Sequence, residues 1–192
     1  MLTPLYDDSI NSELWIMDFE TGSKRKQTTN NVSEYDIALS PDNSQIQFIT
    51  ERGPKIEDNY YQSNVFIIPS AGVEHNPLMP NFPYEIWETE WSGDGKTVYF
   101  TANTGVRCEI FAFSLGDEEP KQLTKGDHAI YRFDYNPQKD ILLYAANSAH
   151  NPATFWMMDA KTAAPKMIYD PYPELKEFDL AKYEAVRWTS VD

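Results

Sequence analysis

Cysteine is nearly absent from this chain of 192 residues, in which Cys108 is the single example. An internal disulfide is therefore excluded. No apolar run approaches the ~18–20 residues that a membrane-spanning helix needs. The first residues, 1–7, carry neither the basic region nor the apolar stretch of a signal peptide. We expect no membrane span, and the compartment stays open between cytoplasm and periplasm.

Basic residues are also scarce, with 16 lysines and arginines against 30 aspartates and glutamates, a formal net charge of −14. Repulsion from phosphates argues against nucleic acid as a partner. Such acidity is typical of a soluble surface, and steering of cationic ligands is the alternative interpretation. Amphipathic helical spacing is nearly absent before residue 173, whereas an aromatic content of 14% fits sheets packed face to face.

Signals for catalysis and metal binding are missing as well. The Gly-x-Ser-x-Gly nucleophile elbow of α/β-hydrolases does not occur. His75, His128 and His150 lie far apart in expected loops, so we interpret them as surface residues. The acidic turns at Asp94 and 117–119 do not match a calcium loop, and no set of zinc ligands is present. We predict no catalytic residue, no metal and no cofactor.

What the chain does have is a repeat. The segment 39–50, LSPDNSQIQFIT, returns in related form at 91–101 and 135–145. Each copy places a bulky residue before turn-forming residues and an apolar run that suits a strand, so each predicts a hairpin. Alignment on Ser40, Ser92 and Asn136 gives spacings of 52 and 44 residues.

A second set of segments lies between the hairpins, at 13–18, 64–69, 109–114 and 154–159. Their spacings of 51, 45 and 45 residues agree with the first set if one copy carries a short insertion. Four strands in about 40–45 residues is the value for a β-propeller blade. We therefore predict an all-β chain with about three full four-stranded blades and a partial one.

The motifs resemble two groups of propellers. The turn 91–96 with the strand 97–102, the pair Leu14-Trp15 and the closing Leu123-Thr124 are similar to repeats of the Tol-system periplasmic propeller protein. They are equally similar to the propellers of the prolyl oligopeptidase family of serine peptidases, most of all its acylaminoacyl-peptidase and dipeptidyl-peptidase branches. The departures are in the turns, where Gly93 replaces proline and 138–139 replace Asp-Gly. The resemblance implies a fragment of a larger propeller with about seven or eight blades.

The repeat also sets the expected boundaries. A partial blade covers 1–31, and full blades cover 32–81, 82–127 and 128–170. The tail 171–192 differs: a short helix is expected from Pro173 and a strand over 183–192. The stretch 184–192 resembles the strand that opens the α/β-hydrolase domain in the peptidase family, and the resemblance implies that such a domain follows.

One loop stands out as a candidate site. The insertion falls in the loop 52–63, and functional residues favour loops on rigid scaffolds. An ordinary surface loop is the alternative. If the loop contacts substrate or the hydrolase domain, the residues expected to do so are Arg52, Glu57, Asp58, Tyr60 and Tyr61.

The resulting hypothesis is a non-catalytic propeller segment that gates the access of short peptides to a C-terminal α/β-hydrolase domain of the same protein. The alternative is a Tol-like module that binds proteins and has no enzymatic activity. A third, weaker interpretation is a glycan-processing propeller. An open arc exposes strand edges, so self-association is also expected.

Overall fold

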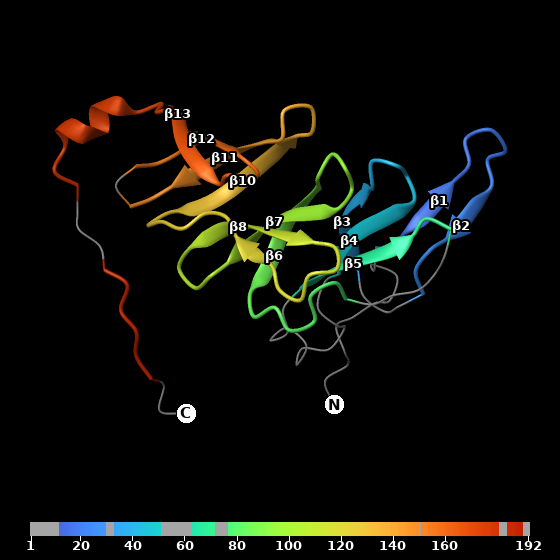
Figure 1. The fold of residues 1–192 in the computed structure, drawn as a ribbon. Coiled ribbons are helices and arrows are strands. Elements are labelled where there is room, and N and C mark those ends of the chain that lie inside the picture. Colours follow the sequence, from blue (N-terminus) through green and yellow to red (C-terminus); the bar gives the residue numbers. More distant parts are fainter. Residues whose placement is uncertain are drawn as a thin grey trace.

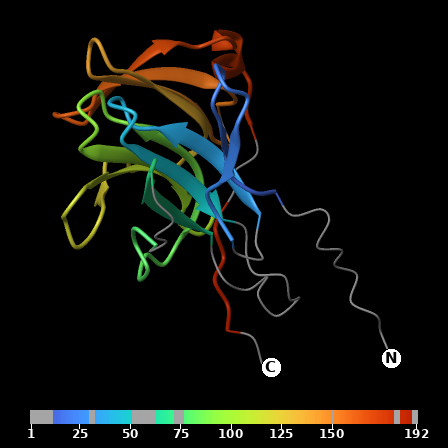
Figure 2. The same ribbon diagram turned by 90° about the vertical axis from the view of Figure 1, so that its right-hand side faces the viewer.

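The structure, a computed structural model, describes residues 12–29, 33–50, 63–71, 77–149, 151–180 and 184–189. It consists of antiparallel sheets that follow one another along the chain, as Figure 1 shows from blue to orange and Figure 2 shows from the side. Sheet I contains β1 (Trp15–Met17) and β2 (Lys24–Lys26). Sheet II contains β3 (Glu34–Leu39), β4 (Gln45–Thr50) and β5 (Asn64–Pro69).

The next two sheets each have four strands. Sheet III consists of β6 (Glu85–Trp91), β7 (Thr97–Asn103), β8 (Cys108–Ser114) and β9 (Lys121–Gln122). Sheet IV consists of β10 (Ala129–Asn136), β11 (Ile141–Asn147), β12 (Thr154–Asp159) and β13 (Ala164–Tyr169). A parallel pair, Ala129 with Cys108, joins the two sheets at one point.

The cores lie between successive sheets, because alternate residues of a strand point to opposite faces. Phe100 and Phe111 of sheet III pack with Ile49 and Val65 of sheet II. On its other face, sheet III contributes Tyr99 and Ile110 to a cluster with sheet IV; the sheet IV members of that cluster include Phe133, Tyr135, Leu142, Tyr144 and Met158. Sheet III is therefore covered on both faces, which explains why β7 is buried from Val98 to Ala102.

The hairpin turns repeat a hydrogen-bonded box. Ser40 Oγ donates to Asp42 Oδ1 at 2.6 Å and accepts from the Gln45 backbone N–H at 3.0 Å. Ser92 Oγ likewise donates to Asp94 Oδ1 at 2.7 Å. The hydrogen bond from Ser40 is the main reason why the pKa of Asp42 falls to about 2.

The structure explains why Gly93 stands where the repeat has proline. A Cβ atom on Gly93 would lie 3.1 Å from Cβ and 3.2 Å from the carbonyl oxygen of Pro137. The turn of sheet III thus packs directly on the turn of sheet IV, and a side chain at position 93 would fit only if Pro137 shifted by a few tenths of an ångström. The next turn closes differently, since Asn136 Oδ1 accepts from the backbone N–H groups of Gln138 and Lys139.

The tail departs from the expected pattern. The short helix is a 3₁₀ helix, η3 (Pro173–Glu177), and none of its residues is buried. The expected strand is not formed in its described part, 184–189, which pairs with no strand and runs clear of the sheets in Figure 1. A strand needs a neighbouring edge for its backbone hydrogen bonds, and this segment has none beside it. Within the described ranges, no helix is long and apolar enough to cross a membrane.

Candidate functional site

The residues of the predicted contact loop, Arg52, Glu57, Asp58, Tyr60 and Tyr61, lie outside the described residues. The strands on either side of the loop are described. Thr50 and Asn64 form the last pair of the β4–β5 ladder. Ser63 Oγ donates to the carbonyl of Ile86 at 2.9 Å, so the base of the loop is tied to the inner strand of sheet III.

The first strands of sheets II, III and IV share an irregularity at one place. The ladders of β3, β6 and β10 shift register after Tyr35, Ile86 and Ile130, respectively. Bulges of this kind redirect side chains and are enriched next to functional sites. The side chains at and beyond these bulges form what we call the inner rim, which comprises Asp36, Trp87, Glu88, Glu90, Tyr131, Arg132 and Asp134.

Carboxylates of the inner rim join each sheet to the next. Asp36 Oδ2 accepts from the backbone N–H of Thr89 at 2.7 Å and from its hydroxyl at 2.5 Å. Glu88 Oε2 accepts from the backbone N–H of Phe133 at 3.3 Å. The repeat spacings of 52 and 44 residues make positions 36 and 88 equivalent, and likewise 89 and 133. The same hydrogen bond between neighbouring sheets therefore occurs twice, and no local sequence motif predicts it.

Arg132 interrupts this series. It occupies the position equivalent to Asp36 and Glu88 but can only donate hydrogen bonds. Its side chain is 78% exposed and lies 3.6 Å from Glu88 Oε1. The rim around it is acidic: burial, followed by the charges of Asp134, Asp36 and Glu88, raises the pKa of Glu90.

A buried carboxylate, Glu109, organises the connection between sheets III and IV. It accepts from the hydroxyl of Thr124 at 2.6 Å and from the backbone N–H of Gly126 at 3.1 Å, and its Oε2 lies 3.1 Å from His128 Nε2. Burial opposes its ionisation, but the hydrogen bonds from His128, Thr124 and Gly126 outweigh that effect and lower its pKa. His128, expected to be a plain surface residue, is thus part of a structural cluster.

Two further kinds of reactive group can be checked among the described residues, the single thiol and possible metal ligands. Cys108 is buried, and burial followed by the nearby charges of Glu109 and Glu88 raises the pKa of its thiol to about 11. Across the described ranges, no group of three histidine, cysteine or acidic side chains could hold a metal ion. His75 and His150 lie outside those ranges.

A groove of about 590 Å³ runs between sheets III and IV on the side of the hairpin turns. Tyr135 donates to Asp140 Oδ1 at 2.8 Å, and Lys161 Nζ lies 2.9 Å from Asp140 Oδ2. The polar groups at this end of the groove are therefore already paired with one another.

Comparison with solved structures identifies the fold. Dipeptidyl peptidase 4 of Porphyromonas gingivalis superposes with a TM-score of 0.68 at 11% identity, covering 86% of this chain and 23% of that one. The propeller domain of the trilobed protease from Pyrococcus furiosus gives a TM-score of 0.63 at 20% identity, covering 82% and 45%. The chain is a run of β-propeller blades. TolB from Acinetobacter baumannii is also similar, with a TM-score of 0.64 at 14% identity over 82% of this chain and 38% of that one.

Sequence comparison agrees with the structural one. Dipeptidyl-peptidase 5 of Porphyromonas gingivalis is 25% identical over 172 residues, which cover 85% of this chain and 23% of that protein. No protein-family model matches. The propeller therefore spans about a quarter of the length of this curated relative. The predicted resemblance to peptidase and Tol-type propellers is confirmed. Sheets III and IV have the four strands expected of a full blade, whereas sheet II has three within the described residues. The blade boundaries remain a prediction.

Proposed function

We propose that this propeller is a non-catalytic segment of a serine peptidase of the prolyl oligopeptidase family, where it limits access of substrates to an α/β-hydrolase domain. The observation that carries the proposal is the similarity to dipeptidyl-peptidase 5 along 85% of the chain. A ring of packed blades passes short peptides and excludes folded proteins, and enclosure keeps bulk water from the reacting centre.

The outward face of sheet IV supports a place in a larger ring. Tyr99 on the corresponding face of sheet III is 6% exposed, whereas Leu143, its equivalent in sheet IV, is 41% exposed. Ile110 is fully buried and its equivalent Phe155 is 36% exposed. We infer that another blade covers this face. At the inner rim, that blade would meet Arg132 with a hydrogen-bond acceptor, in contrast to the joints at Asp36 and Glu88.

The insertion loop remains our proposed contact to substrate or to the hydrolase domain. Its base lies at the joint of sheets II and III, where Ser63 bonds to Ile86. Glu57→Ala with Asp58→Ala should raise KM for short peptides in the complete enzyme. Unchanged kinetics, judged against Glu174→Ala with Glu177→Ala in η3, would reject the loop contact and leave the gating proposal standing.

The decisive experiment uses the complete reading frame that contains these residues. We expect its product to hydrolyse dipeptidyl or acylaminoacyl chromogenic substrates and to spare the same sequences within a folded protein. Phe155→Asp, which places a charge in the proposed joint, should loosen the ring and increase cleavage of longer substrates. A product without peptidase activity would overturn the proposal.

A protein-binding module is the second candidate, favoured by the structural similarity to TolB. In that case the reading frame contains further blades and no hydrolase, and the product binds a protein without cleaving peptides. Activity measurements on the complete product separate the two candidates directly.

A further inference from the structure

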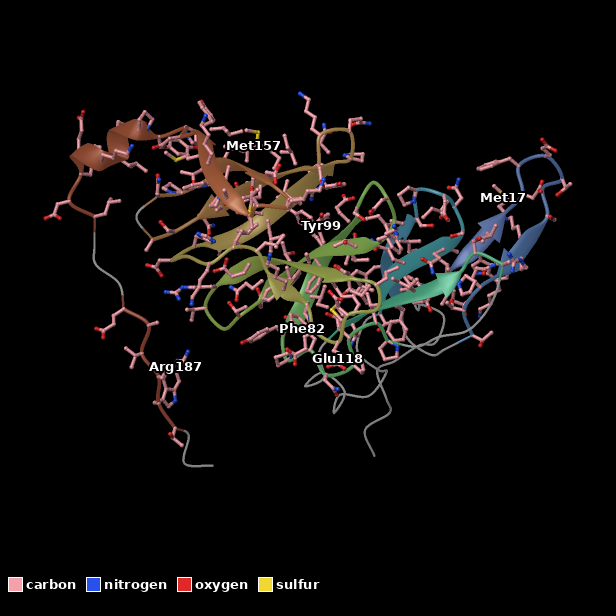
Figure 3. All side chains as sticks on the ribbon, viewed as in Figure 1. Met17, Phe82, Tyr99, Glu118, Met157 and Arg187 are labelled. Carbon is pink, nitrogen blue, oxygen red and sulfur yellow. The ribbon has the colours of Figure 1, made fainter. Side chains whose placement is uncertain are left out.

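A pocket of about 820 Å³ lies at the outer side of the joint between sheets II and III. One wall is the linker 79–84 that leads into β6, and the other is the turn 118–120 between β8 and β9. Phe111 and Gln122 also line it. Figure 3 shows the labelled Phe82 and Glu118 together at this edge of the molecule. The volume is within the usual range for ligand sites, about 300–1,000 Å³.

The aromatic wall is held in place by ring packing. Phe82 makes edge-to-face contacts with Tyr84, Phe100 and Phe111 at centroid distances of 5.5, 5.3 and 5.3 Å, respectively. Phe100 is fully buried, so this contact anchors the linker to the core. The carbonyl of Met79 accepts hydrogen bonds from Asn64 Nδ2 at 2.9 Å and from the backbone N–H of Phe82 at 3.1 Å. The wall is thus preformed.

The charges of the pocket are unbalanced. Glu118 and Glu119 line it and are exposed, and no basic side chain is present among its lining residues. Among the described residues, no lysine or arginine forms an ion pair with either carboxylate. Lys121, the nearest lysine in sequence, lines the groove on the opposite face of sheet III. The pocket therefore combines fixed aromatic rings with two carboxylates that no described lysine or arginine neutralises.

We propose that this pocket binds an arginine side chain presented by a basic segment of a partner protein. A guanidinium group can stack on an aromatic ring and donate to a carboxylate at the same time, which a lysine ammonium does less well. The net charge of −14 adds long-range attraction for such a segment. Binding at this pocket does not depend on the proposed peptidase function, because none of its lining residues belongs to the inner rim or to the insertion loop.

Calorimetric titration of the 192-residue chain with two capped peptides tests the proposal. One peptide carries two central arginines, and the other carries citrulline, the neutral isostere, at both positions. We expect saturable binding of the arginine peptide and at least tenfold weaker binding of the citrulline peptide. Glu118→Gln with Glu119→Gln should reduce binding of the arginine peptide at least tenfold.

The matched control is Glu174→Gln with Glu177→Gln, which removes the same charge from exposed positions of η3. It should leave binding within twofold of the original. If both double variants lose binding of the arginine peptide equally, the peptide is attracted by the overall negative charge and the proposed site is wrong. Equal binding of the two peptides, or no binding of the arginine peptide below about 1 mM, would also overturn it. Tyr84→Leu should weaken binding while circular dichroism confirms the fold.

Discussion

Replacement of Glu109 by glutamine is the most informative perturbation of the cluster between sheets III and IV. The carboxylate accepts from Thr124 and Gly126 and contacts His128, and its side chain is only 2% exposed. Hydrogen bonds to a charged group contribute about 1.5–3 kcal/mol each, and an unsatisfied buried donor costs about 1–3 kcal/mol. Glutamine keeps one acceptor oxygen and replaces the other by a donor, so either the Thr124 hydroxyl or the Gly126 N–H loses its acceptor. We expect Glu109→Gln to lower the free energy of unfolding by about 2–3 kcal/mol at pH 7.

The pH dependence gives this prediction a signature. The pKa of Glu109 in the folded protein lies below its ordinary value of 4.5. Its contribution to stability is therefore complete above pH 4.5 and is lost as the pH falls through the folded-state pKa. The difference between the original chain and Glu109→Gln should shrink in acid.

Urea unfolding at pH 7 and at pH 3.5, followed by circular dichroism, measures the loss of unfolding free energy and its change with pH. Glu174→Gln, at an exposed position of η3, is the control and should change neither. If Glu109→Gln unfolds at the same urea concentration as the original chain, or if the difference stays constant with pH, the charge of Glu109 does not hold the joint.

Three further predictions concern neighbouring features. In Gly126→Ala, the new Cβ would lie 2.5 Å from His128 Nδ1, so His128 should leave Glu109; the stability losses of Gly126→Ala and His128→Ala should then be less than additive in a double-mutant cycle. Gly93→Ala should lower the free energy of unfolding by about 1 kcal/mol, because Pro137 must move by a few tenths of an ångström, and a thermal melt would detect the change. Cys108, with its pKa raised to about 11, should react with a maleimide at pH 7.5 far more slowly in the folded chain than in urea; equal rates would contradict its burial.

The strands were the most predictable part of the structure. The expected segments 64–69 and 154–159 coincide with β5 and β12, because apolar and β-branched residues between turn-formers suit a half-buried strand that pairs with a neighbouring strand. The fourth strands were less predictable. Strand β2 already ends at Lys26, and the buried Gln27 and Thr28 that follow it bond to Leu14 at the end of the ladder. The expected strand in the tail is absent over 184–189 for want of an adjacent edge.

The residues of the inner rim and of the Glu109 cluster could not be found in this way. In the sequence, a carboxylate that accepts a hydrogen bond from the next sheet cannot be distinguished from an ordinary surface acid. Only the packing of the two sheets brings the donor and the acceptor together. The repeat alignment did contain one signal. Positions 36, 88 and 132 are equivalent, and the change from an acid at the first two to Arg132 at the third indicates a different contact at that joint.

Sequence by itself determined the repeat, its period and the all-β character of the chain, because turn chemistry and the alternation of apolar residues are local properties. Tertiary structure alone decided which faces are buried, why Gly93 has no side chain, and which carboxylates are bound. These depend on contacts between residues about 45 positions apart, where packing between two sheets sets the environment of each side chain.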